Sequence, residues 1–165
     1  MNLNEKKILF ADLDGTLITT ASGKTFAEDC TDFRIRKDVL DKIKTLKGTL
    51  ICVNIVTNQG GIPQYVSKED FETKLTAIRY FVAGYTGVSC YSYYCASLNK
   101  DDCRRKPNTG MLKEAWNEWL SSYGKEDALM IGDASGKPGQ FSDSDKKCAE
   151  NFGIDYLDVE DFLIC

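Results

Sequence analysis

The sequence feature that most constrains the fold is a short apolar run at residues 8–11 that leads straight into two aspartates. The run suits a buried parallel strand, and Asp12 and Asp14 follow it one residue apart. Because residues i and i+2 of an extended chain point the same way, both carboxylates share one face at the carboxyl end of the strand. That end is where open α/β sheets bind their ligands. Gly15 then lets the chain turn away through a conformation that other residues avoid.

Two carboxylates held this close repel each other unless a cation lies between them. Asp12 and Asp14 therefore indicate a site for a hard divalent cation such as Mg²⁺, which prefers oxygen ligands. The alternative is an acidic surface turn, because the pattern Asp-x-Asp-Gly is weakly specific on its own. The ends of the other predicted strands favour the cation site.

Composition narrows the possible functions. A chain of 165 residues with 42% hydrophobic content can bury a core, so we expect one domain over residues 1–165. The sequence has no histidine, which excludes Ser-His-Asp and Cys-His catalysis and disfavours most zinc hydrolase sites. Residues 1–7 are polar and no run is long enough to span a bilayer, so we expect no membrane association and a cytoplasmic or nuclear location. In such a location we expect the seven cysteines to be reduced thiols.

Predicted strands and helices alternate along most of the chain. Apolar residues at helical spacing predict helices at 37–46, 67–84, 109–123, 145–152 and 159–164, with Trp116 and Trp119 on the buried side of the third. Ser67 and Asp70 form a capping box that opens the second helix. Apolar and β-branched runs predict further strands at 50–56, 88–94, 128–131 and 154–157. This alternation predicts an α/β fold with a single doubly wound, Rossmann-like parallel sheet and helices on both faces.

Residues 17–36 are polar and lack periodicity. We interpret them as a small flap inserted after the first strand, with a short hairpin in it. The flap would lie over the site at the end of that strand.

Polar side chains mark the ends of other predicted strands. Thr57 and Asn58 end the second strand, Asp133 ends the fourth, and Lys106 precedes a helix. The carboxyl ends of parallel strands lie along one edge of a sheet, so these groups converge. Together they supply the parts that phosphoryl transfer needs: a carboxylate nucleophile, a metal site, fixed donors, a positive charge and an acid.

Four segments in this order resemble the four motifs of the haloacid dehalogenase superfamily of phosphatases, across the whole chain: Asp12-Leu13-Asp14-Gly15-Thr16, Thr57-Asn58-Gln59, Lys106-Pro107 and Gly132-Asp133. The resemblance implies that Asp12 attacks phosphorus and becomes an aspartyl phosphate. It implies that Asp14 protonates the leaving hydroxyl and then activates water, that Thr57 holds a phosphoryl oxygen, and that Lys106 steadies Asp12. It also implies that Mg²⁺ is held by Asp12, Asp133 and the backbone carbonyl of Asp14.

Within that superfamily the chain resembles the polynucleotide 3′-phosphatase branch, on residues 57–62, 105–111, 132–137 and 141–145. The branch implies an Mg²⁺-dependent phosphomonoesterase that removes 3′-phosphates from single-stranded or frayed ends of DNA or RNA in nucleic-acid end repair. It implies four substrate-binding residues: Thr16, Asn58, Gln59 and Arg105. We expect no 5′-kinase activity from this chain, which has no separate P-loop domain. We also expect a monomer.

In this branch a second acidic residue completes the metal site. Asp145 aligns best with it, and Asp143 stays open as a neighbour. A helix N-cap is the other interpretation of Asp143, which precedes Lys146 and Lys147.

Two alternatives to a nucleic-acid enzyme stay open. One is a small-molecule phosphatase of the same superfamily acting on a sugar phosphate or histidinol phosphate. The other is a silent binding module, which would have no reason to keep both Asp12 and Asp14. Cys90, Cys95 and Cys103 lie where related small-molecule phosphatases carry a zinc loop, but the missing histidine and the wide spacings favour free thiols.

The charge pattern bears on the substrate. Lys100, Arg104 and Arg105 form a basic cluster beside the predicted site, and we expect a groove between this loop and the flap. The net charge of −4 disfavours tight, non-specific binding of duplexes. Contact with a single-stranded 3′ end is compatible with a local basic cluster.

Overall fold

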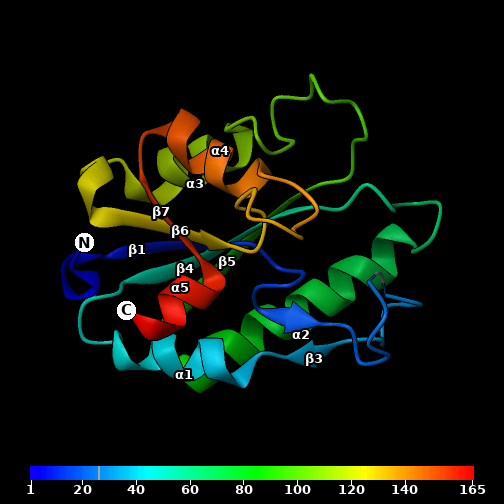
Figure 1. Cartoon of the computed structure of the whole chain (residues 1–165), viewed down its shortest axis with the longest axis horizontal. Coiled ribbons are helices and arrows are strands. Elements are labelled where there is room, and N and C mark those ends of the chain that lie inside the picture. The colour runs from blue at the N-terminus through cyan, green and yellow to red at the C-terminus, as the bar shows by residue number, and fades with distance from the viewer. Residues whose placement is uncertain (26) are drawn as a thin grey trace.

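The centre of the protein, in a computed structural model that describes residues 1–25 and 27–165, is a five-stranded parallel sheet (Figure 1). Its order is β5-β4-β1-β6-β7. The strands are β1 (Ile8–Ala11), β4 (Cys52–Asn58), β5 (Ser89–Cys95), β6 (Ala128–Gly132) and β7 (Asp155–Asp158). Later strands are added on both sides of β1, so the strand order reverses there, which is where doubly wound sheets bind ligands. The predicted α/β class is confirmed.

Helices cover both faces of the sheet (Figure 1). One face packs against α1 (Lys37–Thr45), α2 (Lys68–Thr86) and α5 (Val159–Ile164), and the other against α3 (Gly110–Ala115) and α4 (Ser144–Phe152). Strand β1 shows why the sheet is two-faced. Leu9 and Ala11 belong to the first core, Ile8 and Phe10 to the second, and none is more than 1% exposed. A strand buried on both faces reads as a continuous apolar run, as the sequence indicated.

The flap forms the expected antiparallel hairpin from β2 (Ile18–Thr19) and β3 (Arg34–Ile35). Residue 26 of the predicted flap lies outside the described residues. The Asp32 carboxylate accepts hydrogen bonds from Glu28 N (2.9 Å), Ser22 N (2.6 Å) and Ser22 Oγ (2.7 Å). These bonds, led by the Glu28 amide, lower the pKa of Asp32 to about 2. One ionised side chain thus ties two parts of the flap together.

Two details differ from the prediction. Strand β4 spans Cys52–Asn58 rather than the predicted residues 50–56, and it ends with Thr57 and Asn58 as expected. Trp119 was predicted to be buried, and this is wrong, because its side chain is 63% exposed. The segment Trp116–Leu120 is a π-helix, whose wider turn rotates Trp119 away from the core. It stacks on Tyr91 instead, with ring centroids 6.0 Å apart.

Helix α2 begins as predicted, with Ser67 Oγ accepting the Asp70 amide at 3.0 Å. Two 3₁₀ turns, Leu3–Glu5 and Lys125–Asp127, complete the helical elements of the described chain. None of the helices that the structure describes is long and apolar enough to cross a membrane.

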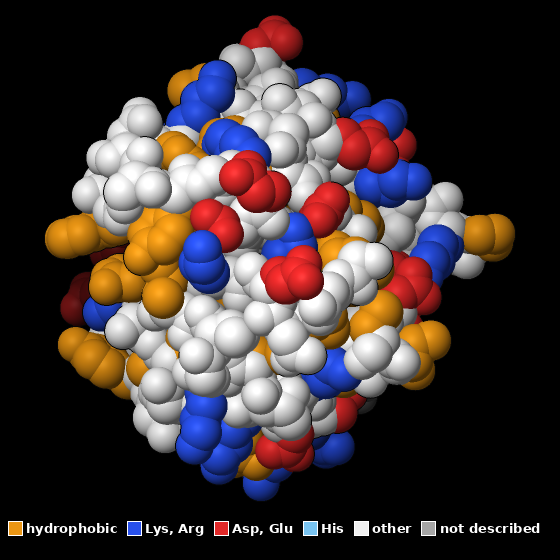
Figure 2. Space-filling view, turned by 90° about the vertical axis from the view of Figure 1, so that its left-hand side faces the viewer, with side chains coloured by type: hydrophobic (Ala, Val, Ile, Leu, Met, Phe, Trp, Pro, Cys, Tyr) orange, Lys and Arg blue, Asp and Glu red, His pale blue; other side chains and the backbone are white. Residues whose placement is uncertain are grey.

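The face at the amino ends of the strands is turned towards the viewer in Figure 2. Lysine, arginine and acidic side chains are interspersed on it, and hydrophobic side chains gather towards one edge of the view. An interspersed surface of this kind produces no single-sign field for a polyanion.

Candidate active site

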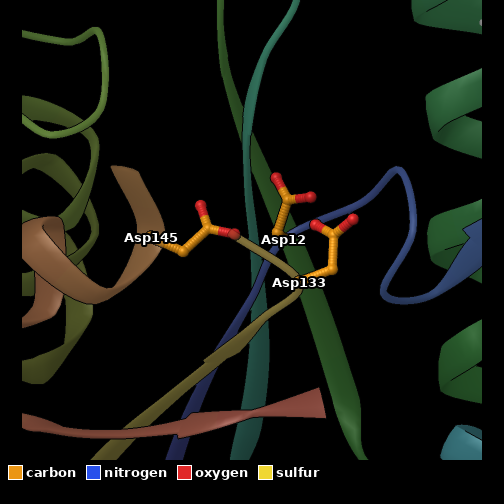
Figure 3. A group of neighbouring side chains, drawn as sticks. All are labelled: Asp12, Asp133 and Asp145. Carbon is orange, nitrogen blue, oxygen red and sulfur yellow. The ribbon is translucent and has the colours of Figure 1, made fainter. Parts of the chain in front are cut away.

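Three carboxylates converge at the carboxyl edge of the sheet (Figure 3). Asp12 follows β1, Asp133 follows β6, and Asp145 comes from the first turn of α4. One oxygen from each lies within 4.8 Å of the others. The Asp12 amide donates to Ile131 O at 3.0 Å, which fixes the end of β1 against β6. The convergence predicted from the strand ends is therefore present in the structure.

Lys106 supplies the positive charge of this cluster. Its Nζ atom lies 2.5 Å from Asp12 Oδ1 and 2.7 Å from Asp145 Oδ1, and donates to Val56 O at 2.8 Å. The residue is 4% exposed, so water screens these contacts little. Burial alone would lower the pKa of Lys106, but the charges of Asp12 and Asp145 outweigh it and raise that pKa. Lys106 therefore stays charged over the whole neutral range.

Asn58 holds the backbone of Lys106. Its Oδ1 accepts the Lys106 amide at 2.9 Å and its Nδ2 donates to the Lys106 carbonyl at 3.0 Å. Both polar ends of the side chain are thus committed to one residue of the protein. The geometry makes Asn58 a positioning residue for Lys106 and gives no support to its predicted role in binding substrate.

Two glycines allow the carboxylates to approach the backbone. Gly15 has φ +82°, and a Cβ atom there would lie 2.0 Å from Asp133 Oδ2. A Cβ atom on Gly132 would lie 2.2 Å from Asp145 Oδ2. Any larger side chain at either position would displace a carboxylate of the cluster, so the glycines are part of the site.

Asp14 lies at the exposed side of the cluster and has its own partner. Gln59 Nε2 lies 2.7 Å from Asp14 Oδ2 and 2.9 Å from Thr57 Oγ1, as donor to both. Thr57 is buried and Asp14 is exposed, so Gln59 links the interior of the site to its mouth. This link was missed from the sequence, which assigned Gln59 to substrate. The signal was the two-residue spacing of Thr57, near the end of β4, and Gln59, just after it, which turns both side chains the same way where the chain stays extended.

The donor set fits a hard divalent cation. Burial, with Asp145 next, raises the pKa of Asp133 to about 6. Burial also raises the pKa of Asp12 well above its usual value, against the opposing charge of Lys106. Burial thus disfavours the charged form of both carboxylates, and a single lysine faces the three carboxylates of the cluster. Carboxylate oxygens at this separation are ligands that Mg²⁺ accepts, and such binding displaces protons.

The other predicted site residues are placed differently. Asp143 occupies the N-cap position of α4, where its side chain forms no capping bond within the described chain and pairs with Lys147 at 2.7 Å. Asp143 therefore lies apart from the cluster that includes Asp145.

Arg105 donates to Ser97 O at 2.6 Å and so braces the loop after β5. Thr16 has no exposed surface, and its hydroxyl has no partner among the described residues, so nothing in this geometry opens it to substrate.

The thiols show no metal-binding arrangement within the described chain. All seven cysteines are free. Cys95 is buried, Cys90 is half-buried and Cys103 is exposed. The one group of candidate metal ligands found among the described residues is the aspartate cluster.

Comparison with known proteins points to one family. The profile of the family described as polynucleotide kinase 3 phosphatase matches residues 7–163. A bifunctional polynucleotide phosphatase/kinase of Schizosaccharomyces pombe is 35% identical over 165 residues, covering 96% of this chain and 38% of the relative. A 20.8 kDa protein of the Autographa californica nuclear polyhedrosis virus is 33% identical over 164 residues, covering 95% and 85%.

Other relatives have names that refer to histidine biosynthesis. The histidine biosynthesis bifunctional protein HisB of Legionella pneumophila is 30% identical over 166 residues, covering 93% of this chain and 41% of the relative. The chain thus spans about two fifths of the yeast and Legionella proteins.

Solved structures share the fold. A protein of Mesorhizobium loti assigned to the HAD-like phosphatases superposes with a TM-score of 0.65 at 24% identity, covering 90% of this chain and 69% of that one. The D,D-heptose 1,7-bisphosphate phosphatase of B. bronchiseptica, complexed with magnesium and phosphate, superposes with a TM-score of 0.70 at 19% identity, covering 91% and 78%. At these identities the likeness shows the fold alone, and the fold is that of HAD-like phosphatases.

Proposed function

Because this chain belongs to the polynucleotide kinase 3 phosphatase family and has a HAD-like phosphatase fold, we propose that it removes 3′-phosphates from the ends of DNA or RNA in an Mg²⁺-dependent reaction. Membership of the family confirms the resemblance seen in the sequence. The observation that carries the chemistry is the contact of Lys106 Nζ with the buried Asp12 carboxylate at 2.5 Å. A carboxylate held beside a fixed cation is oriented to attack a phosphoryl group and is neutralised as it does so.

In the first step Asp12 forms a bond to phosphorus while the bond from phosphorus to the 3′ oxygen breaks. Asp14 gives its proton to that oxygen, since an alkoxide is a poor leaving group. Lys106 and the hydroxyl of Thr57 stabilise the negative charge of the transferring group. Asp14 is suited to this part because it lies at the mouth of the site and is oriented by Gln59.

In the second step water attacks the aspartyl phosphate. Asp14, now ionised, takes a proton from the water, and the bond between Asp12 and phosphorus breaks to release phosphate. The exposed position of Asp14 gives water access to it. When bound, Mg²⁺ would be held by Asp12, Asp133, Asp145 and the backbone carbonyl of Asp14, and would neutralise phosphoryl oxygens.

The substrate assignment draws on the family match over residues 7–163 and on the yeast relative, whose name states a polynucleotide phosphatase. A single-stranded or frayed 3′ end, a role in end repair, a monomeric enzyme, and a cytoplasmic or nuclear location are parts of the proposal. The second candidate is a small-molecule phosphatase for a sugar phosphate or histidinol phosphate. The Legionella relative and the heptose bisphosphate phosphatase fold favour it.

The test is a panel assay with equal concentrations of a 3′-phosphorylated oligonucleotide, its 5′-phosphorylated isomer, histidinol phosphate and heptose 1,7-bisphosphate. Each is measured with Mg²⁺ and with excess chelator, and Asp12→Asn serves as the matched blank. We expect the 3′-phosphorylated oligonucleotide to be hydrolysed at least about 100-fold faster than the others, with chelator abolishing the reaction. Preference for either small phosphate would overturn the nucleic-acid assignment in favour of the second candidate.

A further inference from the structure

A buried carboxylate outside the four motifs lies at the junction of β7 and α5. Asp158 ends β7, caps α5 by accepting the Glu160 amide at 3.1 Å, and is 3% exposed. A buried charge is costly unless several donors satisfy it, so its partners show what it stabilises.

Those partners belong to the loop that follows β6. Asp158 Oδ2 accepts hydrogen bonds from Ser135 Oγ at 2.5 Å and from Gln140 Nε2 at 2.6 Å. Lys137 Nζ lies 3.3 Å from Oδ1. Burial alone would raise the pKa of Asp158, but the bonds from Ser135 and Gln140 outweigh it and lower that pKa. An ionised carboxylate therefore fastens this loop to the junction of β7 and α5.

The loop is also braced from within. Gln140 Oε1 accepts the amides of Ser135 at 2.8 Å and Lys137 at 3.1 Å. Ser135 Oγ lies 2.7 Å from the hydroxyl of Tyr156, which donates to Gly132 O at 3.0 Å. The backbone from Gly132 to Ser135 is thus held at both ends by side chains of one network.

That backbone carries one of the three clustered carboxylates and is hydrogen-bonded to a second. Asp133 is part of it. The Ala134 amide donates to Asp145 Oδ2 at 3.2 Å, and the Ala134 carbonyl accepts the Asp145 and Lys146 amides at 3.2 Å each. The Asp145 carboxylate also packs directly against Gly132, since a Cβ atom there would overlap it. Displacement of Ser135 would therefore move Asp133 and Asp145 together.

The geometry points to Asp158 as a positioning residue for the metal site: through Ser135 and Gln140 it holds the backbone that aims Asp133 and Asp145 at one cation. The inference rests on the proposed function, because it takes the carboxylate cluster as an Mg²⁺ site. Asp158 touches neither the cluster nor a reacting atom. Its role is to keep the donor oxygens at the spacing that Mg²⁺, with its narrow geometric tolerance, requires.

The experiment is calorimetric titration of the substrate-free protein with Mg²⁺. In Asp158→Asn the new amide group cannot accept from both Ser135 and Gln140 while also capping α5, so at least one donor loses its partner. We expect the Kd for Mg²⁺ to rise about tenfold or more, as is typical when groups behind metal ligands are changed. The matched control is Asp161→Asn, on the same helix. Asp161 contacts the same Lys137 at 2.8 Å but is half-exposed, and its replacement should leave the Kd unchanged.

Kinetics provide a second readout. With a 3′-phosphorylated oligonucleotide, Asp158→Asn should need more Mg²⁺ for half-maximal rate and should recover most of its kcat when Mg²⁺ is in excess. Ser135→Ala and Gln140→Ala should raise the Kd in the same direction by smaller factors, and they carry the test if Asp158→Asn does not fold. The double variant Asp158→Asn/Gln140→Ala should raise the Kd by less than the product of the two single factors, because the two changes share the contact between Asp158 and Gln140.

The outcomes separate the inference from the function it rests on. A lower Tm with an unchanged Kd for Mg²⁺ would make Asp158 a structural brace only and overturn the inference, while the proposed function survives. If the wild-type protein bound no Mg²⁺, the metal-dependent function and the inference would both fall.

Discussion

The active site has a floor and a rim that differ in their physical character. The floor, defined as Asp12, Thr57, Lys106 and Asp145, is at most 8% exposed, and its charges are paired with one another. The rim, defined as Asp14, Gln59, Lys100 and Arg105, is exposed or half-exposed. A buried ion pair cannot change without a large loss of stability, whereas an exposed group can. We therefore expect the floor to determine the reaction and the rim to determine the substrate.

The largest effect is expected at the floor, from Asp12→Asn. The amide keeps the shape but cannot attack phosphorus, so kcat should fall by at least about 10⁴-fold while the circular dichroism spectrum stays native. Asp41→Asn, at an exposed position bonded to Tyr85, is the control and should hydrolyse normally. Hydrolysis near the wild-type rate by Asp12→Asn would eliminate the covalent mechanism.

Lys106→Met tests whether a charge buried in the floor contributes more to stability and activity than a charge on the surface. The change leaves Asp12 and Asp145 buried without a cation, so the free energy of unfolding should fall by about 3 kcal/mol and kcat by about 10²- to 10³-fold. Urea denaturation with and without Mg²⁺ measures this, and Mg²⁺ should restore more stability to the variant than to the wild type. Lys147→Met is the control, because it removes only the exposed pair with Asp143 and should cost less than about 1 kcal/mol. Equal losses in the two variants would contradict the distinction between the buried charges of the floor and exposed charge.

Gln59→Met tests the link between floor and rim. It removes the donor that orients Asp14, so hydrolysis of a 3′-phosphate, whose leaving group needs a proton, should slow about tenfold. An aryl phosphate hardly needs that proton and should be affected less. Asp14→Asn should show the same difference between substrates in a more severe form. If Gln59→Met slowed the hydrolysis of both substrates equally, Gln59 would bind substrate or stabilise the fold rather than orient Asp14.

The rim itself is tested with substrates of increasing length. We expect kcat/KM to rise from a 3′-phosphorylated mononucleotide to a dinucleotide and a longer strand, and salt to erode that rise. Lys100→Ala should reduce the gain with length about two- to threefold and the salt slope by about one. Arg104→Ala is the control and should do less, because its guanidinium is paired with Glu114 at 3.2 Å. If kcat/KM did not change with substrate length, the small-molecule phosphatase would become the favoured function. The proposed roles of the aspartates would not be affected.

The smallest effect is expected in the flap. The pKa of Asp32 is lowered to about 2, so its stabilising bonds are complete above its ordinary pKa of 3.8 and are lost as pH falls towards 2. The difference in stability between the wild type and Asp32→Asn should therefore be constant above about pH 4 and shrink below it. Thermal unfolding of both proteins between pH 2 and 6 measures this. A difference that persists at pH 2 would assign the effect to packing instead.

The fold and part of the floor could be predicted from local patterns, whereas Asp145 was assigned only through the resemblance to a known family. Continuous apolar runs predicted the central strands, and helical spacing predicted α1 and α5. A polar residue at the carboxyl end of a buried parallel strand lies at the same edge of the sheet as the ends of the neighbouring strands. Asp12 and Asp133 needed nothing more than this rule. Their catalytic and metal-binding roles stay predictions.

What could not be predicted depends on partners distant in sequence or on a change of helical pitch. Asn58 was assigned to substrate because nothing local shows that Lys106, 48 positions later, takes both ends of its amide. The contacts of Asp158 could not be predicted, because Ser135 and Gln140 become its neighbours only when β7 pairs with β6. Trp119 was misplaced because a π-turn leaves no mark in the apolar spacing.

The central place of β1 has a consequence for how the protein fluctuates. The strand is hydrogen-bonded to β4 on one side and to β6 on the other, so its amides can exchange with solvent only when the sheet itself opens. The hairpin of β2 and β3 is a separate two-stranded unit, held to the core through the buried Ile18, and we expect it to open at lower free energy than β1. Asp12 is thus attached to the last part of the molecule to unfold, while the segment beside it can rearrange many times between global unfolding events. Sequence change in the hairpin can accordingly accumulate without altering the strand that carries Asp12.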